Sequence, residues 1–195
     1  MVDTAVKAAR DVRKAEGKEV RAARIRDAAR DILGDVGITG LTMRAVATHA
    51  GYTAGSVYSY FVSKEALLAA LAVDEIDQLG RKLRLQPDTS LADKAKTCVP
   101  VLQRVVPLLT AARRGDVPED TERALTGRII VILRLLDQSV AEGGVRDGGT
   151  SARALDTIGL WSALVGVALL SGSGRFASLD VKEADVTDAL IARFM

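Results

Sequence analysis

The 195-residue chain is poor in the residues that build most metal sites and covalent cross-links. It has one cysteine, Cys98, and one histidine, His49. A single cysteine cannot form a disulfide within the chain, and one histidine with one distant cysteine cannot complete a zinc site. We therefore expect a reducing, cytoplasmic environment and no metal or other cofactor.

Long apolar runs are scarce as well. Residues 1–19 are charged and rich in alanine, so we expect no secretory leader there. The most apolar run, Ile158–Leu170, is shorter than a helix needs to be to cross a bilayer. Because 48% of the residues are hydrophobic and 27% are charged, the composition is that of a globular protein. We expect no membrane partner.

The motifs of common enzyme classes are missing too. The chain has no phosphate-binding loop of the Gly-x-x-x-x-Gly-Lys-Ser/Thr type, no dinucleotide-binding glycine pattern after a strand and no Gly-x-Ser-x-Gly elbow. The glycine-rich segment Gly143–Gly149 follows a predicted helix and lacks the lysine, which favours a flexible loop. We therefore do not expect an enzyme.

The most informative stretch that is present runs from Thr42 to Lys64. Thr42 can cap a short helix, and Gly51 can close that helix in the left-handed conformation. Thr53 can cap a second short helix, whose inward face would carry Val57, Tyr58 and Phe61. Two short helices joined by a glycine-containing turn form a helix-turn-helix, whose second helix enters the major groove of DNA.

This stretch resembles the DNA-binding domain of the tetracycline-repressor (TetR) family of bacterial regulators. The residues that carry the resemblance are Thr42, Arg44, Ala47, Ala50, Gly51, Ser56, Val57, Tyr58, Tyr60, Phe61, Lys64, Glu65 and Leu67. The helix predicted over Val20–Val36 and its Gly37-Ile38 exit resemble the family too. The resemblance implies an all-α fold, with an N-terminal three-helix helix-turn-helix DNA-binding domain and a larger helical ligand-binding and dimerisation domain.

We expect three segments along the chain. A basic N-terminal arm covers residues 1–19, the DNA-binding domain covers 20–66, and the ligand-binding and dimerisation domain covers 67–195. Gly17 argues against one rigid helix that runs from the arm into the next segment. Up to Lys64 the chain has 11 basic and 7 acidic residues, a net charge of +4, and the remainder has 16 and 18, a net charge of −2. A net positive charge in this N-terminal third suits contact with the phosphates of a nucleic acid.

Beyond the motif, the pattern predicts helices only. A fourth helix capped by Ser63 runs to about Leu85, with Leu67, Leu68, Leu71, Ile76, Leu79 and Leu83 on its inward side. Pro100 and Pro107 should kink or split the next helix, over 91–110. A helix over 118–141 is apolar almost all round between Ile129 and Leu136 and should be central. Further helices are predicted over 150–170 and 182–194, with a break at 172–174.

The resemblance implies DNA contacts from nine residues: Thr42, Arg44, Thr53, Ala54, Gly55, Ser56, Tyr58, Tyr60 and Lys64. An arginine fork suits the O6 and N7 atoms of guanine, so Arg44 is the candidate base reader; the alternative is a solvated surface arginine. Tyr58, Tyr60 and Lys64 are candidate phosphate contacts, although Tyr58 can also be an aromatic at the edge of the core. Because Ala54 has no polar side chain, few residues of this helix can read bases directly. DNA shape should therefore contribute to operator choice.

In the larger domain, three residues are polar or large within apolar helices and are candidate ligand contacts: Gln103, Arg134 and Trp161. Their alternative is a satisfied polar group in the core, or an ion pair of Arg134 with Asp137. Cys98 is either a buried small hydrophobe or a redox-sensing thiol. The candidate dimer interface is a stripe of small residues, with one leucine from the last helix: Gly159, Ser162, Ala163, Gly166 and Leu190. The alternative is close packing within one subunit.

The function that the resemblance implies is a homodimeric, ligand-responsive transcription regulator that acts as a repressor, with a palindromic double-stranded DNA operator as its partner. A small-molecule effector bound in the larger domain would shift the fourth helix and change the spacing of the two DNA-binding domains of the dimer. This change would release the DNA. The alternative is a helical carrier or sequestering protein for an apolar small molecule, in which the N-terminal domain no longer binds DNA.

Overall fold

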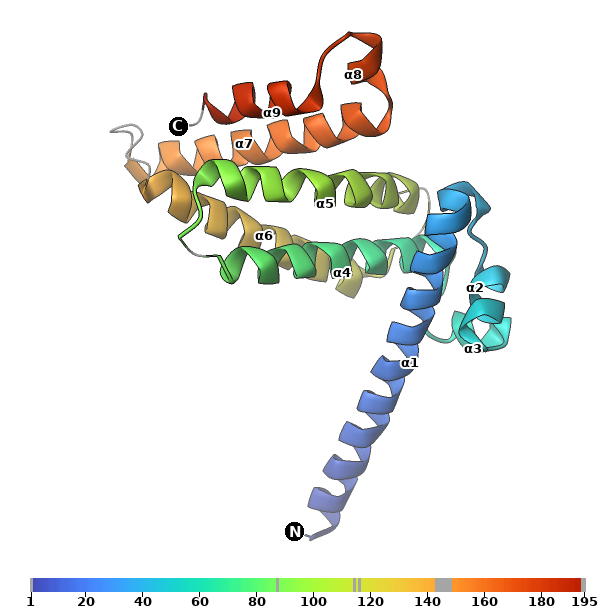
Figure 1. The fold of residues 1–195 in the computed structure, drawn as a ribbon. Coiled ribbons are helices and arrows are strands. Elements are labelled where there is room, and N and C mark those ends of the chain that lie inside the picture. Colours follow the sequence, from blue (N-terminus) through green and yellow to red (C-terminus); the bar gives the residue numbers. More distant parts are fainter. Residues whose placement is uncertain (1, 87, 114, 116, 143–148, 194–195) are drawn as a thin grey trace. The chain divides into compact units, whose positions relative to one another are not determined.

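The computed structural model describes residues 2–86, 88–113, 115, 117–142 and 149–193. Within these ranges the chain forms nine α-helices and no strand, which confirms the predicted all-α fold (Figure 1). It divides into two compact units: unit 1 is Met1–Leu67 and unit 2 is Leu68–Met195. The division falls inside α4 (Lys64–Arg84), so this helix contributes residues to both units.

Unit 1 contains α1 (Val2–Gly40), α2 (Met43–Ala50), α3 (Ala54–Tyr58) and the first turn of α4. The helix α2 packs against both α1 and α3 (Figure 1). Non-helical backbone at Gly37, with φ 67° and ψ −176°, breaks the path of α1 near its end. The core is made of small and aliphatic side chains from α1, α2, α3 and the link after α1, including Ile25, Ala29, Leu41, Val46 and Val57.

The N-terminal part of α1 differs from the expectation based on Gly17. The helix continues through this glycine from Val2 onward, as one element with the first helix of the DNA-binding domain. The cost of one glycine in a helix interior is about 1 kcal/mol relative to alanine. Residues 2–16 include several alanines and long charged residues, which are good helix formers, and these offset that cost.

Unit 2 contains the rest of α4 and five more described helices: α5 (Leu91–Ala112), α6 (Glu119–Glu142), α7 (Gly149–Gly172), α8 (Arg175–Ser178) and α9 (Glu183–Ile191). The helix α7 packs against α5, α6, α8 and α9 (Figure 1). The break at 172–174 is confirmed, with Gly174 at φ 68°. The short helix α8 was not predicted. Of the loop expected over Gly143–Gly149, residues 143–148 lie outside the described residues, and Gly149 already belongs to α7. The last helix was predicted to reach Phe194, but α9 ends at Ile191.

The fourth helix follows its prediction closely. The Ser63 hydroxyl accepts a hydrogen bond from the backbone N–H of Ala66 at 3.0 Å, which caps the start of α4. All six predicted inward residues are at most 1% exposed: Leu67, Leu68, Leu71, Ile76, Leu79 and Leu83.

Two predictions for the next helices need correction, namely that the prolines could split the first one and that the second is central. Neither Pro100 nor Pro107 splits α5, which is one helix from Leu91 to Ala112. Both prolines lie on its exposed side, so the carbonyl groups that lose a hydrogen-bond partner can meet water. The helix α6 is not buried all round: Ile132 and Leu136 are fully buried, but Ile130 is 43% exposed. Unit 2 covers only one face of α6.

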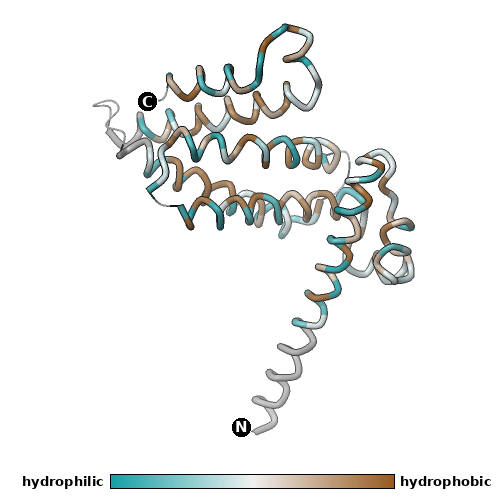
Figure 2. Tube along the Cα trace, in the orientation of Figure 1, coloured by the Kyte–Doolittle hydropathy of each residue, from teal (hydrophilic) through white to brown (hydrophobic). Residues whose placement is uncertain are grey.

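The apolar part of α7 extends beyond the run Ile158–Leu170. Among the described helices, its segment Arg153–Gly172 is long and apolar enough to cross a bilayer, although a core helix of a soluble protein passes the same test. The length argument from the run Ile158–Leu170 was therefore wrong. In this structure α7 packs against four other helices, and most of its trace has intermediate to hydrophobic colour (Figure 2). The helix also leaves apolar side chains exposed, among them Leu155 at 69% and Leu169 at 51%.

Candidate nucleic-acid interface

The turn between α2 and α3 forms as the sequence predicts. The Thr42 hydroxyl accepts a hydrogen bond from the backbone N–H of Ala45 at 3.2 Å, and Thr53 does the same for Ser56 at 3.2 Å. Gly51 closes α2 with φ 76° and ψ 33°, the left-handed conformation that glycine adopts without a steric penalty. Two capped helices thus meet at a turn whose geometry is set by local sequence.

The front of α3 is exposed and made of small residues. Thr53, Gly55 and Ser56 are exposed and Ala54 is half-buried. A side chain at Gly55 would meet no described atom within 4 Å, so the backbone is accessible there. Thr53 donates its hydroxyl hydrogen to the Ser56 oxygen at 3.0 Å, and this leaves the Ser56 O–H free to turn toward an outside acceptor. This front can approach a groove closely.

Arg44 lies in the first turn of α2 and is exposed. It borders an open groove of about 510 Å³. The groove is lined by Ile32, Thr42, Arg44, Ala45, Thr48 and His49. The structure thus places the candidate base reader on an accessible, concave surface beside the Thr42 cap.

The candidate phosphate contacts have different surroundings. Tyr58 was expected on the inward face with Val57 and Phe61, but it is 49% exposed while those two are buried. Tyr60 is half-buried. Lys64 donates from Nζ to the backbone carbonyl of Ile38 at 2.6 Å, which ties the start of α4 to the end of α1. An ammonium group has three donors, so this bond leaves others for a phosphate.

Three contacts between α1 and the motif were not predicted. The Arg21 side chain hydrogen-bonds to Tyr60, and this contact raises the pKa of Arg21. The Arg24 guanidinium lies over the Tyr52 ring, 5.8 Å from its centroid. His49 lies with Nε2 3.0 Å from the Asp31 carboxylate. Each pair joins residues far apart in sequence, so no local pattern could reveal it.

Charge in this part of the chain is of one sign. Between Asp35 and Glu65 the sequence has no acidic residue, while it carries Arg44 and Lys64. The helix-turn-helix is therefore free of carboxylates that would repel a phosphate backbone.

The sequence profile of a known family matches this region. The family is described as bacterial regulatory proteins of the tetR family, and the match covers residues 25–71. Residues 25–71 of the chain therefore form a DNA-binding domain of the TetR type. Helix-turn-helix transcriptional regulators of Mycobacterium tuberculosis and Mycobacterium bovis are 31% identical to this chain over 94 residues. That alignment covers 48% of this chain and 40% of each regulator, so the chain matches less than half the length of these relatives.

Solved structures share the fold over most of the chain. The regulatory protein SCO4313 superposes with a TM-score of 0.66 at 18% identity, covering 93% of this chain and 98% of its own. The transcriptional regulator FadR of Bacillus subtilis, in complex with stearoyl-CoA, superposes with a TM-score of 0.62 at 15% identity, covering 88% and 96%. At these identities the likeness shows the fold alone, and it covers both units.

The three candidate ligand residues have separate environments. Gln103 donates from Nε2 to Ser171 at 3.0 Å and to Glu183 at 2.8 Å, which joins α5 to α7 and α9. Arg134 is exposed and Trp161 is half-buried. Asp137, the proposed partner of Arg134, instead pairs with Arg153 at 3.3 Å. Their assignment as ligand contacts stays a prediction.

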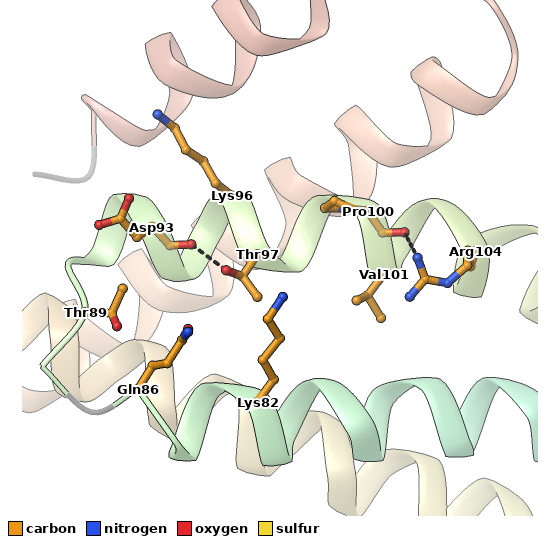
Figure 3. Close-up of a pocket in the computed structure, with 9 residues that line it drawn as sticks. All are labelled: Lys82, Gln86, Thr89, Asp93, Lys96, Thr97, Pro100, Val101 and Arg104. Carbon is orange, nitrogen blue, oxygen red and sulfur yellow. Dashed lines mark hydrogen bonds between the residues drawn. The ribbon is translucent and has the colours of Figure 1, made fainter.

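Unit 2 also has an open groove between the end of α4 and α5, with a volume of about 550 Å³ (Figure 3). Its lining is mostly polar: Lys82, Gln86, Thr89, Asp93, Lys96, Thr97, Pro100, Val101 and Arg104. Lys96 pairs with Asp188 at 2.8 Å and Arg104 with Glu75 at 2.9 Å, so two of its three cations are already neutralised. None of the three candidate ligand residues lines this groove.

Cys98 is fully buried in α5. Burial raises the pKa of its thiol to about 12, so the thiol stays protonated at neutral pH. Because the thiolate is the reactive form, the structure favours a packing role for this residue over redox sensing.

The stripe of small residues lies on the uncovered side of α7. Ser162 is exposed, and Gly159, Ala163 and Gly166 are half-buried, as is Leu190 of α9. A side chain at Gly166 would meet no described atom within 4 Å, which argues against close packing inside one subunit at this position. The exposed apolar residues Leu155, Ile158 and Leu169 flank the stripe at helical spacing.

Proposed function

We propose that this chain is a DNA-binding transcriptional regulator, a homodimeric repressor that a small-molecule ligand releases from a palindromic operator. The observation that carries the proposal is the capped α2–Gly51–α3 motif with its exposed front of Thr53, Gly55 and Ser56. Such a helix can enter the major groove, and the absence of carboxylates from residues 36–64 lets phosphates approach.

In this proposal Arg44 reads a base, while Tyr58, Tyr60 and Lys64 hold phosphates. Arg44 is exposed beside an open groove, and Tyr58 is half exposed although its neighbour Val57 is fully buried. Thr42 and Thr53 serve mainly as helix caps, since both hydroxyls accept backbone hydrogen bonds. Ala54, Gly55 and Ser56 form the close-contact surface.

The dimer is supported by the uncovered side of α7. Leu155, Ile158 and Leu169 are between 50% and 69% exposed on a helix whose other side packs against unit 2. Exposed apolar side chains in a row on one helix mark an interaction surface. A second copy that packs its own α7 on the first, together with Leu190 of α9, would cover them in a two-fold arrangement.

The ligand response would pass through α4. In unit 2, Glu75 of α4 pairs with Arg104 of α5 at 2.9 Å, and Asp77 with Arg128 of α6 at 3.4 Å. A ligand that moved α5 or α6 would therefore pull on α4, whose first residues belong to unit 1. The bound FadR relative holds stearoyl-CoA, which supports a ligand with a large apolar part. The ligand must bind the DNA-incompetent state more tightly.

The test is a titration of labelled duplex DNA, taken from the region that precedes the chain's own gene, followed by fluorescence anisotropy at several salt concentrations. A scrambled duplex of equal composition is the control. We expect tighter binding to the native sequence and a steep loss of affinity with salt, because bound phosphates release counterions. Binding that is absent on both duplexes at low salt would contradict the proposal and favour the helical carrier.

A further inference from the structure

The guanidinium group of Arg24 in α1 lies against the turn that leads into α3, and two separate distances place it there. Its Cζ atom lies over the ring of Tyr52, 5.8 Å from the centroid. Its Nη2 atom lies 3.7 Å from the position that a Cβ atom on Gly51 would take. Tyr52 directly precedes Thr53, the residue that caps α3. The first helix therefore places a positive charge beside the start of the proposed recognition helix.

We propose that Arg24 binds a backbone phosphate of the operator DNA from α1, and that the ring of Tyr52 holds its guanidinium in position for this contact. The inference rests on the proposed DNA-binding function and adds to it a residue from outside the helix-turn-helix. The group that Arg24 recognises is a phosphodiester, which accepts paired hydrogen bonds from a guanidinium. Arg24 is then the binding residue, and Tyr52 is a positioning residue.

The contact with Tyr52 leaves the hydrogen-bond donors of Arg24 unused. An aromatic face attracts the positive charge of a guanidinium as a whole, whereas a carboxylate would also accept hydrogen bonds from its N–H groups. Arg24 is exposed, and among the described residues none is hydrogen-bonded to it or forms an ion pair with it. Its N–H groups therefore remain available to an anion from solution.

The charge of Arg24 is not neutralised by its neighbours. The nearest acidic residues on either side of it in sequence are Glu19 and Asp27, and each pairs with another arginine of α1. Glu19 pairs with Arg26 at 2.7 Å. Asp27 pairs with Arg30 at 2.5 Å. Because the helix-turn-helix has no carboxylate either, a phosphate that approaches this side of unit 1 meets an uncompensated positive charge.

Tyr52 restricts a side chain that has many rotamers. An arginine loses much of this freedom when it binds a ligand, and attraction to a half-buried ring removes part of it before DNA arrives. Less entropy is then lost on binding. The backbone N–H of Tyr52 donates to the carbonyl of Ala47 at 2.8 Å, which fixes the backbone of this residue at the end of α2. The turn thus holds both the start of α3 and the ring that orients Arg24.

The experiment uses the full-length chain with substitutions at each of the two positions: Arg24→Gln, Arg24→Lys, Tyr52→Leu, Tyr52→Phe and the double variant Arg24→Gln/Tyr52→Leu. The probes are mixed-sequence duplex DNA and the native upstream duplex, followed by fluorescence anisotropy at several salt concentrations. Arg123→Gln is the matched control, because it removes one positive charge from unit 2, where Arg123 pairs with Glu119 at 3.1 Å. Circular dichroism and thermal denaturation check the fold of every variant.

We expect Arg24→Gln to weaken binding to both duplexes by about tenfold and to reduce the salt slope by about one. Arg24→Lys should keep the slope, because it keeps the charge. The control Arg123→Gln should change neither affinity nor slope.

The two substitutions of Tyr52 separate the ring from the hydroxyl. Tyr52→Leu removes the aromatic face and should weaken binding by about two- to fivefold with an unchanged slope. Tyr52→Phe keeps the face and should bind as the wild-type chain does. The double variant should bind about as weakly as Arg24→Gln alone, since the ring acts only through the arginine.

An unchanged salt slope in Arg24→Gln would overturn the phosphate contact. Equal losses in Tyr52→Phe and Tyr52→Leu, or losses that multiply in the double variant, would overturn the positioning role of the ring. A lower melting temperature of Arg24→Gln with unaltered DNA binding would show that the pair only braces unit 1, and would overturn the inference as a whole. If the proposed function itself were wrong, the wild-type chain would bind neither duplex.

Discussion

Gly51 is the residue on which the turn between α2 and α3 depends. Its φ of 76° lies in the left-handed region, where a Cβ atom costs about 1–2 kcal/mol. We therefore expect Gly51→Ala to lower the free energy of unfolding by about that amount in urea denaturation. Gly34 offers the matched control, because it lies inside α1 with no described atom within 4 Å of an added Cβ. Gly34→Ala should leave stability unchanged or raise it by up to about 1 kcal/mol; equal losses in both variants would contradict this account of the turn.

Arg44 and Tyr58 should differ in what their loss does to DNA recognition. If Arg44 reads a guanine, Arg44→Ala should cost about 1–3 kcal/mol of binding and relax preference at one operator position. Tyr58→Phe removes a phosphate donor, so it should weaken all sequences alike. Binding measured against a set of single-base operator variants separates the two. Equal, sequence-independent losses from both substitutions would reduce Arg44 to a backbone contact.

At the scale of elements, the first half of α1 should contribute affinity without contributing to the core. Where the structure describes side chains of α1, from Glu16 onward, the first buried residue is Ala22. Residues 1–18 include the basic residues Lys7, Arg10, Arg13, Lys14 and Lys18. We expect a chain that begins at Glu19 to fold, to bind duplex DNA more weakly and to show a smaller salt slope. Thermal denaturation and a salt titration test both parts. A truncated chain that no longer folds would make this segment structural.

Some features of the helices could be predicted from the sequence and others could not. The caps at Thr42, Thr53 and Ser63 were predictable because each joins residues three apart along the chain. The continuity of α5 through its two prolines was not predictable, because the effect of a proline depends on which side of the helix meets water. The helix α6 was expected to be central from its composition, yet burial depends on what packs around it.

The interface itself was predictable only in part, for the same reason. Its motif residues lie in one short stretch, so their spacing was visible in the sequence. The contacts of Arg21 and Arg24 join α1 to residues 28 or more positions away, and only the packed structure brings them together. In the sequence these arginines cannot be distinguished from the solvated charged residues of an ordinary surface helix.

At the scale of the whole molecule, the uncovered side of α7 decides whether two DNA-binding domains can bind one operator together. Gly166 lies at the centre of the stripe and half-buried in the single chain, with no described atom within 4 Å of an added Cβ. If two copies of α7 pack closely there, Gly166→Leu places a large side chain between them, and overpacking costs about 1–3 kcal/mol. Within one subunit the same leucine meets open space, so the fold should survive.

We therefore expect Gly166→Leu to sediment as a monomer with wild-type helicity and to lose most of its affinity for a full palindrome, because a monomer places only one DNA-binding domain on the operator. Gly127→Leu is the matched control: this glycine is exposed on α6 and has equally open surroundings. The control should keep the mass and operator affinity of the wild-type chain. A Gly166→Leu variant that stays dimeric with full affinity would place the interface elsewhere, whereas loss of helicity would show that the stripe packs within a subunit after all.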